Sequence, residues 1–214
     1  MTTQTIKVGI CGLGTVGQGV IALLSEGGDV LSNRVGGKIE LVHVATRTPK
    51  PEVDTLGARD SRDVFDVARN PSVDVLIELI GGTTVAKELV VEALNQGKHV
   101  VTANKALLAD HGDELFTLAE SKGVALRFEA AVAGGIPVIE AVKTSLAGNH
   151  VSSVAGIING TGNFILTEMA AKGREFSDVL AEAQAGGYAE ADPSCESEGS
   201  DAALPRGWLA SLAL

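Results

Sequence analysis

Short apolar segments alternate with stretches of helical periodicity through roughly the first 130 residues of this 214-residue chain. The apolar segments are rich in Val, Ile and Leu, as the strands of a buried sheet are. Two of the intervening stretches, 86–96 and 106–121, have clear helical spacing and are followed by glycine. Strands that alternate with helices indicate βαβ units, so we predict an α/β fold with a doubly wound parallel sheet and helices on both faces. The predicted strands are 6–11, 39–45, 73–80, 99–103 and 124–129.

The pattern changes after residue 135. We therefore predict a doubly wound domain over 1–135 and a second, partial α+β domain over 136–214. The single strand expected in the second domain cannot satisfy its backbone hydrogen bonds alone. Either another chain pairs with it, or the domain is incomplete. The elements predicted in the second domain are a helix over 138–147, a strand near 151–158, and helices over 164–172 and 177–185.

A glycine motif directly follows the first predicted strand. Gly12, Gly14 and Gly17 have GxGxxG spacing, and an apolar stripe of helical spacing begins at Val16. In dinucleotide-binding folds the first glycine permits a tight turn, the second lets the backbone approach a pyrophosphate, and the third lets helix and strand pack closely. The phosphates then lie on unpaired N–H groups at the positive end of the helix. The motif predicts a dinucleotide site, and a glycine-rich turn without a ligand is the alternative. The residues expected to form the site are Gly12, Leu13, Gly14, Thr15, Val16 and Gly17.

Composition narrows the range of partners. Apolar residues make up 45% of the chain, which is typical of a folded globular protein. The formal net charge is −10 and only 3% of the residues are aromatic, so we expect no nucleic-acid partner. No apolar run approaches the roughly 20 residues of a membrane span, and the first residues lack the features of a signal peptide. Cys11 and Cys195 are too few for a disulfide framework or a metal cluster, and we expect a cytoplasmic protein.

Cationic residues follow two of the predicted strands. Arg47 comes just after strand 39–45, where an NAD site usually has an acid that binds the ribose hydroxyls, whereas an arginine can accommodate the 2′-phosphate of NADP. With Lys50 nearby, this favours NADP, and a solvent-exposed loop arginine is the alternative. Lys105 follows strand 99–103, where substrate meets cofactor, and a lysine there can donate a hydrogen bond or a proton to a carbonyl oxygen as hydride arrives. A surface lysine at the end of a strand is the alternative.

Carboxylates form a second group of candidates. Glu129 ends the last predicted strand of the first domain, before a loop of small residues whose carbonyls could help to bind a hard cation. The alternative to a cation site is that Glu129 is simply exposed to solvent. An acidic cluster after Gly187 could hold the ammonium group of an amino-acid substrate, and a solvated acidic loop is the alternative. This cluster comprises Glu190, Asp192, Glu196, Glu198 and Asp201.

Four segments together resemble the homoserine dehydrogenase family. They are the glycine motif 12–17, the lysine-containing segment 97–109, the Asn-Gly-Thr segment 159–161 and the Tyr-Ala-Glu segment 187–193. The second and fourth are specific to the family, and the resemblance covers about residues 6–203. Members interconvert L-aspartate 4-semialdehyde and L-homoserine with NAD(P)H, on the route to threonine, isoleucine and methionine. They form dimers through the sheet of the substrate domain, which would supply the absent strand partners.

The resemblance also implies roles for individual residues. The three glycines would bind the pyrophosphate of NADP or NAD, and Arg47 the 2′-phosphate. Lys105 would act at the reacting oxygen and also contact the cofactor, with Glu190 and Asp201 also assigned to catalysis. Residues facing the amino-acid end of the substrate would be Gly160, Thr161, Glu190, Glu196 and Asp201. A monovalent cation site, typically for sodium, would use Glu129 with the carbonyls of Val132, Gly134 and Ile136.

The chain departs from the family pattern in two places. The family follows its aspartate with Asp-x-x-x-Lys, whose lysine is catalytic, but here Pro205 comes four residues after Asp201. Family-like sequence returns at Leu209. The chain also stops at Leu214, whereas members continue. We expect an NAD(P)-dependent homoserine dehydrogenase. The alternatives are a truncated, non-catalytic dinucleotide-binding homologue and another Rossmann enzyme, such as a methyltransferase.

Overall fold

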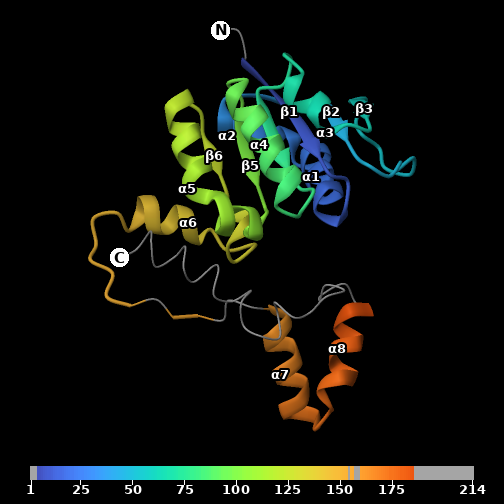
Figure 1. The fold of residues 1–214 in the computed structure, drawn as a ribbon, viewed down its shortest axis with the longest axis vertical. Helices are drawn as coiled ribbons and strands as arrows, with labels where there is room; N and C mark the ends of the chain where they lie inside the picture. The colour runs from blue at the N-terminus through green and yellow to red at the C-terminus, as the bar shows by residue number, and fades with distance from the viewer. Residues whose placement is uncertain (1–3, 154, 157–159, 186–214) are drawn as a thin grey trace. The chain divides into compact units, whose positions relative to one another are not determined.

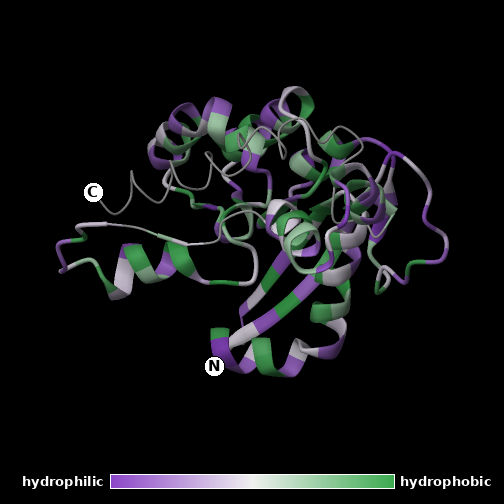
Figure 2. Cartoon of the chain, turned by 90° about the horizontal axis from the view of Figure 1, so that it is seen from below, coloured by the Kyte–Doolittle hydropathy of each residue, from purple (hydrophilic) through white to green (hydrophobic). Residues whose placement is uncertain are grey.

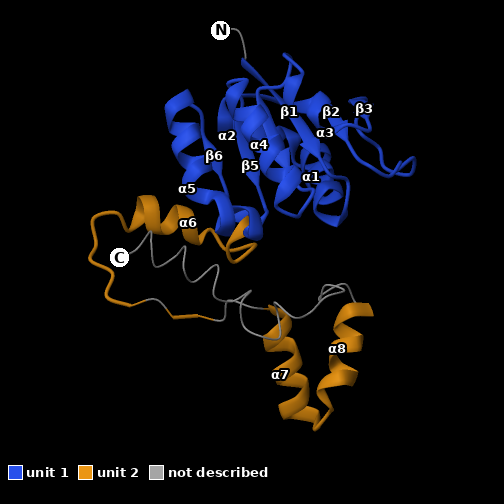
Figure 3. Ribbon diagram, in the orientation of Figure 1, with its two compact units in different colours: residues 1–130 blue, residues 131–214 orange. Residues whose placement is uncertain are grey.

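The computed structural model describes residues 4–153, 155–156 and 160–185. The density of contacts divides the chain into two compact units, residues 1–130 and residues 131–214 (Figure 3). The boundary predicted after residue 135 lies within the second unit.

The first unit is built around a parallel sheet of six strands in the order β3-β2-β1-β4-β5-β6 (Figure 1). From the central β1 the chain moves outward through β2 and β3, and then crosses to β4 on the other side. This is the strand order of the doubly wound dinucleotide-binding fold, and it confirms the predicted fold class. The elements are β1 (Gln4–Cys11), α1 (Thr15–Glu26), α2 (Gly28–Val35), β2 (Gly37–Ala45), β3 (Arg59–Ser61), α3 (Val64–Arg69), β4 (Val75–Glu78), α4 (Thr84–Asn95), β5 (His99–Thr102), α5 (Lys105–Lys122) and β6 (Leu126–Arg127).

Strand β1 is buried on both faces because helices cover both. Val8 and Ile10 belong to a buried cluster that also includes Ile21 of α1. Gly9, whose position points to the other face, lies so close to Val67 of α3 that a Cβ there would collide with it. On that second face α4 contacts both α3 and α5, whereas α1 contacts α2. Figure 2 shows hydrophobic and hydrophilic residues following one another along the helices, as expected of helices that pack one face against the sheet and expose the other.

Three short elements of the first unit are absent from the sequence-based prediction. Helix α2 has eight residues, none of them buried, β3 has only three residues, and α3 has six. Two predicted strands are shorter than expected: β4 has four residues within 73–80, and β6 has two within 124–129. The apolar residues that flank β4 and β6 pack in the core without pairing in the sheet, for example Val73 and Phe128.

The regular elements described in the second unit are helices. Helix α6 (Val138–Glu140) continues as a π-helical turn over Ala141–Ser145, within the helix predicted over 138–147. The two helices predicted over 164–172 and 177–185 are confirmed as α7 (Gly160–Lys172) and α8 (Phe176–Ala185). Across the residues that the structure describes, no helix is both long and apolar enough to cross a membrane.

The strand predicted near 151–158 is wrong for residues 151–153, 155 and 156, which have no regular secondary structure. Residues 154, 157 and 158 lie outside the described residues. A strand needs a neighbour to satisfy its backbone N–H and C=O groups, and the elements described in this unit are helices.

Helices α7 and α8 pack against each other. Ile165 of α7 and Val179 of α8 are buried. Arg174, in the turn between the helices, pairs with Glu182 at 2.6 Å and with Glu168 at 3.3 Å. Exposed ion pairs of this kind contribute only about 0–1 kcal/mol each, so burial of the apolar residues is the main contribution to this packing.

Candidate functional site

The glycine turn after β1 lies at the point where the strand order of the sheet reverses, because β1 has β2 on one side and β4 on the other. Gly12 has a φ of +104°, and its N–H donates to the carbonyl of Ala45 at 2.8 Å. A Cβ on Gly12 would lie 2.5 Å from the carbonyl oxygen of Leu79, just after β4. Both the dihedral angle and the close approach require glycine here. In doubly wound sheets ligands bind at this switch point, beyond the carboxyl ends of the strands.

The other two glycines have opposite surroundings. Gly14 is the N-cap of α1, and a Cβ built on it would meet no atom within 4 Å. Gly17 is buried, and a Cβ there would collide with the carbonyl oxygen of Gly12. Gly17 is therefore required for packing within the protein, whereas Gly14 faces open space. No side chain caps α1, and Thr15 and Val16 in its first turn are exposed, so its first N–H groups are available to an anion.

A cleft of about 660 Å³ begins at this turn. Three cationic side chains line it: Arg47 and Lys50 after β2, and Arg62 after β3. Arg62 donates to the carbonyl of Thr46 at 3.2 Å and to both carboxylate oxygens of Asp60, at 2.8 and 3.3 Å. The other lining residues are Gly12, Leu13, Gly14, Thr46, Thr48, Asp63, Val64, Phe65, Leu79, Ile80, Gly81 and Val85.

The cleft contains residues that the sequence analysis missed. Arg62 is the clearest case, because it follows β3, a strand too short to show a pattern. Asp63 accepts a hydrogen bond from the N–H of Phe65 at 2.9 Å and so caps α3. An Asp at the start of a helix is a recognisable capping signal, but it becomes useful only once α3 has been identified.

A hydrogen-bonded network joins the ends of β4 and β5 beside the cleft. The Glu78 side chain is fully buried, and its Oε1 accepts from the N–H groups of Ile80 at 2.9 Å and Gly81 at 3.4 Å. Its Oε2 accepts from the hydroxyl of Thr102 at 2.5 Å. That hydroxyl oxygen in turn accepts from the N–H of Asn104 at 3.0 Å.

Asn104 positions the start of α5. Its side-chain oxygen accepts from the N–H of Leu107 at 3.0 Å and caps the helix, while its amide donates to the carbonyl of Gly82 at 2.7 Å. Lys105 is the first residue of α5 and is exposed. It does not belong to the lining of the cleft described above. Lys105 lies at the same edge of the sheet as the cleft. It follows Asn104, whose side chain is hydrogen-bonded to Gly82, next to the cleft-lining Gly81.

Buried titratable groups near the sheet have shifted pKa values. Burial raises the pKa of the Cys11 thiol far above its usual range, and the neighbouring charge of Glu78 adds to the effect. Burial lowers the pKa of His43, and the positive charge of Arg59 lowers it further. Burial also lowers the pKa of Lys98, whose amine donates to two backbone carbonyls, both at 2.7 Å. Lys98 precedes β5 and is therefore at the edge of the sheet opposite the cleft.

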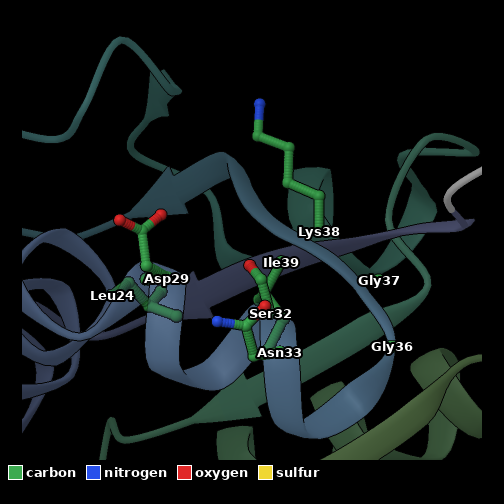
Figure 4. A pocket seen from close by; sticks show the side chains of 9 residues that line it. Leu24, Asp29, Ser32, Asn33, Gly36, Gly37, Lys38 and Ile39 are labelled. Atoms are coloured by element: carbon green, nitrogen blue, oxygen red, sulfur yellow. The ribbon is translucent and has the colours of Figure 1, made fainter.

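A second hollow, of about 640 Å³, lies between α2 and the start of β2 (Figure 4). It is at the amino end of the parallel strands, because Gly37 pairs in register with Gln4. Figure 4 shows Lys38 extending away from Asp29 and Ser32 of α2, and its amine lies 3.5 Å from the carboxylate of Glu40. The hollow is therefore separate from the glycine turn, which lies at the carboxyl end of β1.

The predicted substrate residues are described only in part. Gly160 and Thr161 form the first turn of α7. Glu190, Glu196 and Asp201 lie outside the described residues, as does Pro205.

For the predicted cation site, Glu129 begins a 3-10 turn over Glu129–Ala131, at the end of the first unit. Val132, Gly134 and Ile136 belong to the second unit. Val132 is buried and Ile136 is exposed. Within the described part of the chain, no three His, Cys, Asp or Glu side chains gather as in a metal centre. A site made of one carboxylate and backbone carbonyls is of a different kind, so it stays a prediction.

Comparison with known proteins assigns both parts of the chain to one family. Residues 12–129 match the family model described as "Homoserine dehydrogenase, NAD binding domain", and residues 137–214 match the model "Homoserine dehydrogenase". A homoserine dehydrogenase of Pseudomonas aeruginosa is 58% identical over 98% of this chain and 48% of its own length. One from Corynebacterium glutamicum is 46% identical over 98% of this chain and 47% of its own length.

Solved structures agree with the sequence relatives. A homoserine dehydrogenase from Thiobacillus denitrificans superposes with a TM-score of 0.93 at 47% identity, covering 99% of this chain and 49% of that one. A hyperthermophilic archaeal homoserine dehydrogenase in complex with NADPH shares the fold, with a TM-score of 0.82 at 24% identity, over 98% of this chain and 70% of that one. The chain spans about half the length of the curated relatives it matches. On these matches, and with its glycine turn at the switch point of a doubly wound sheet, the chain belongs to the homoserine dehydrogenase family.

Proposed function

We propose that this chain provides the dinucleotide site and part of the substrate site of an NAD(P)-dependent homoserine dehydrogenase, which reduces L-aspartate 4-semialdehyde to L-homoserine. One observation carries the proposal: the turn at Gly14 faces open space at the mouth of a cationic cleft, while Gly12 and Gly17 are tightly packed. The residues present therefore fit a pyrophosphate. In a chain of net charge −10, a local group of cations is a specific feature of this cleft.

The cations of the cleft favour NADP over NAD. Arg47 is exposed after β2, where an acid would otherwise bind the ribose, and Lys50 and Arg62 line the same cleft. Arg62 is already paired with Asp60, so Arg47 is the better candidate for the 2′-phosphate.

Each part of the chain has a distinct role in the proposed reaction. The bound dinucleotide supplies a hydride to the aldehyde carbon. The N–H groups at the start of α1 hold its phosphates and fix its position in the cleft. Lys105 donates a hydrogen bond or a proton to the aldehyde oxygen, which gains negative charge as the carbon is reduced. Glu190, Glu196 and Asp201, with Gly160 and Thr161, bind the amino-acid end of the substrate, and Glu190 and Asp201 also serve catalysis.

Further proposals concern ions, assembly and location. Glu129 and the carbonyls of Val132, Gly134 and Ile136 bind a monovalent cation such as sodium. Two copies of the chain form a homodimer through the second unit, and the activity is cytoplasmic. Size-exclusion chromatography with light scattering tests the dimer, and a titration of thermal stability with NaCl against choline chloride tests the cation.

A non-catalytic dinucleotide-binding homologue is the second candidate. Pro205 favours it, since proline cannot donate a proton or a hydrogen bond from its side chain. One experiment separates the two: purified chain is mixed with NADPH and L-aspartate 4-semialdehyde, and both the absorbance at the NADPH band and the cofactor fluorescence are followed. Oxidation of NADPH supports the enzyme, binding without oxidation supports the second candidate, and no binding contradicts both.

A further inference from the structure

Glu78 occupies the centre of the carboxyl edge of the sheet. It pairs in register with Cys11 of β1 on one side and with Thr102 of β5 on the other. Cys11 leads directly into the glycine turn, and Thr102 leads into the segment that carries Lys105. A buried carboxylate is unfavourable unless hydrogen bonds satisfy it, and this one accepts three. Its position therefore lies between the two halves of the proposed site.

The three hydrogen bonds divide into two branches. Oε1 accepts from the N–H groups of Ile80 and Gly81, which line the cleft beside the glycine turn. Oε2 holds the hydroxyl of Thr102, and through it the N–H of Asn104, next to Lys105. One branch therefore fixes the cleft wall and the other fixes the start of α5.

We propose that Glu78 is a positioning residue, whose carboxylate sets the place of the Lys105 segment relative to the cofactor cleft by way of Thr102. The effect of Glu78 on catalysis rests on the proposed function, whereas the hydrogen-bonded link from Glu78 to the start of α5 does not. The reason for such a device is geometric: a displacement of about 1 Å in a reacting group can cost roughly 100-fold in rate. Lys105 follows β5 whereas the glycine turn follows β1, so a hydrogen-bonded link through Glu78 of β4 holds the start of α5 in a fixed place relative to the cleft.

The network requires a carboxylate rather than an amide. Both oxygens of Glu78 act as acceptors, and the Thr102 hydroxyl donates to one of them while accepting from Asn104. In a Glu78→Gln variant the amide oxygen can still hold Ile80 and Gly81. The amide N–H₂ group would then face the Thr102 oxygen, and the Thr102 proton would lose its acceptor. Glu78→Gln is therefore expected to weaken the branch toward Asn104 while sparing the cleft wall.

The test compares Thr102→Val, Thr102→Ser and Glu78→Gln with the wild-type chain. Lys98→Met is the control, because it removes a buried polar group of the same unit at the opposite edge of the sheet. Amide hydrogen exchange is measured by mass spectrometry on peptides covering 79–83 and 103–108. We expect Thr102→Val and Glu78→Gln to exchange about tenfold faster over 103–108 and unchanged over 79–83, since each leaves a buried hydrogen-bonding group unsatisfied in that branch. Thr102→Ser keeps the hydroxyl and should behave as wild type.

Two further measurements separate positioning from loss of stability. Thr102→Val should bind NADPH within about twofold of wild type, and, in semialdehyde reduction, lower kcat about tenfold with little change in KM. Lys98→Met should lower the melting temperature without changing exchange in either peptide.

Wild-type exchange over 103–108 in both Thr102→Val and Glu78→Gln would overturn the proposal, as would an equal acceleration in Lys98→Met. If Thr102→Val does not fold, Glu78→Gln decides through the same peptides. If the wild-type chain does not bind NADPH, the proposed function fails, and the exchange rates still decide the coupling.

Discussion

Gly14 and Gly17, in the glycine motif after β1, are expected to respond differently to alanine: one substitution should weaken cofactor binding and the other should lower stability. At Gly14 the backbone has φ −73° and ψ −166°, which alanine adopts without strain, and a Cβ meets no atom of the protein. Gly14→Ala should therefore change the free energy of unfolding by no more than about 1 kcal/mol. The new methyl group would occupy the space through which the backbone approaches the pyrophosphate. Losing one charge-assisted hydrogen bond costs about 1.5–3 kcal/mol, so NADPH should bind roughly 10- to 100-fold more weakly.

Gly17→Ala should act on folding instead. The Cβ would collide with the carbonyl oxygen of Gly12, a backbone atom that cannot rotate away, so α1 must move from the turn. Such overpacking costs about 1–3 kcal/mol and should lower the melting temperature by several degrees. Gly19→Ala is the matched control, because Gly19 is an exposed residue of the same helix with open space around its Cβ position. It should raise stability by up to about 1 kcal/mol.

The assay combines thermal unfolding, followed by circular dichroism, with titration of NADPH fluorescence for the three variants. If Gly14→Ala bound NADPH as tightly as Gly19→Ala, the phosphates would not lie on this turn and the assignment of the cleft would be refuted. If Gly14→Ala melted as low as Gly17→Ala, the difference in packing between the two positions would be refuted.

Three other predictions concern single side chains. Arg47→Ala should weaken NADPH binding about tenfold and leave NADH binding unchanged, as judged by parallel fluorescence titrations; equal losses for both would exclude a 2′-phosphate role. Because burial lowers the pKa of His43 below its ordinary 6.5, the unfolded chain takes up a proton first, and the free energy of unfolding should fall as pH drops from about 7 to about 5. Denaturant titrations of wild type and His43→Gln check this, and an equal slope in both would contradict it. Since burial raises the pKa of the Cys11 thiol, iodoacetamide at about pH 8 should label its peptide slowly in the folded protein and rapidly in urea; rapid labelling of the folded protein would contradict the burial.

The sequence was sufficient for the fold where a long segment repeats its pattern. The apolar strands β1, β2 and β5 and the long helices α1, α4 and α5 all match predicted segments. The glycine motif could be placed because its spacing and its flanking elements lie next to one another in the chain. The short elements α2, β3 and α3 bury too few residues in a row to leave a signal, and tertiary contacts determine them.

The candidate site was less accessible from the sequence. In the sequence, Glu78 looks like a solvent-facing residue within an apolar strand. Its carboxylate is buried and accepts a hydrogen bond from Thr102, which is 24 residues away. Arg62 lines the cleft because it follows β3, which pairs with β2. Such residues are recognised from contacts that a linear pattern does not contain. Glu190, Glu196 and Asp201 stay predictions because they lie outside the described residues.

The two rims of the sheet differ in what they offer to an incoming strand. The sheet ends on one side in β3, with three residues, and on the other in β6, with two. The two-residue β6 offers few backbone groups to an incoming strand, so its rim is a poor template for strand addition. The opposite rim differs, because β3 pairs with β2 only over His43–Ala45 and does not cover residues 37–42 of β2. A strand added to this sheet would therefore find its longer template along β2.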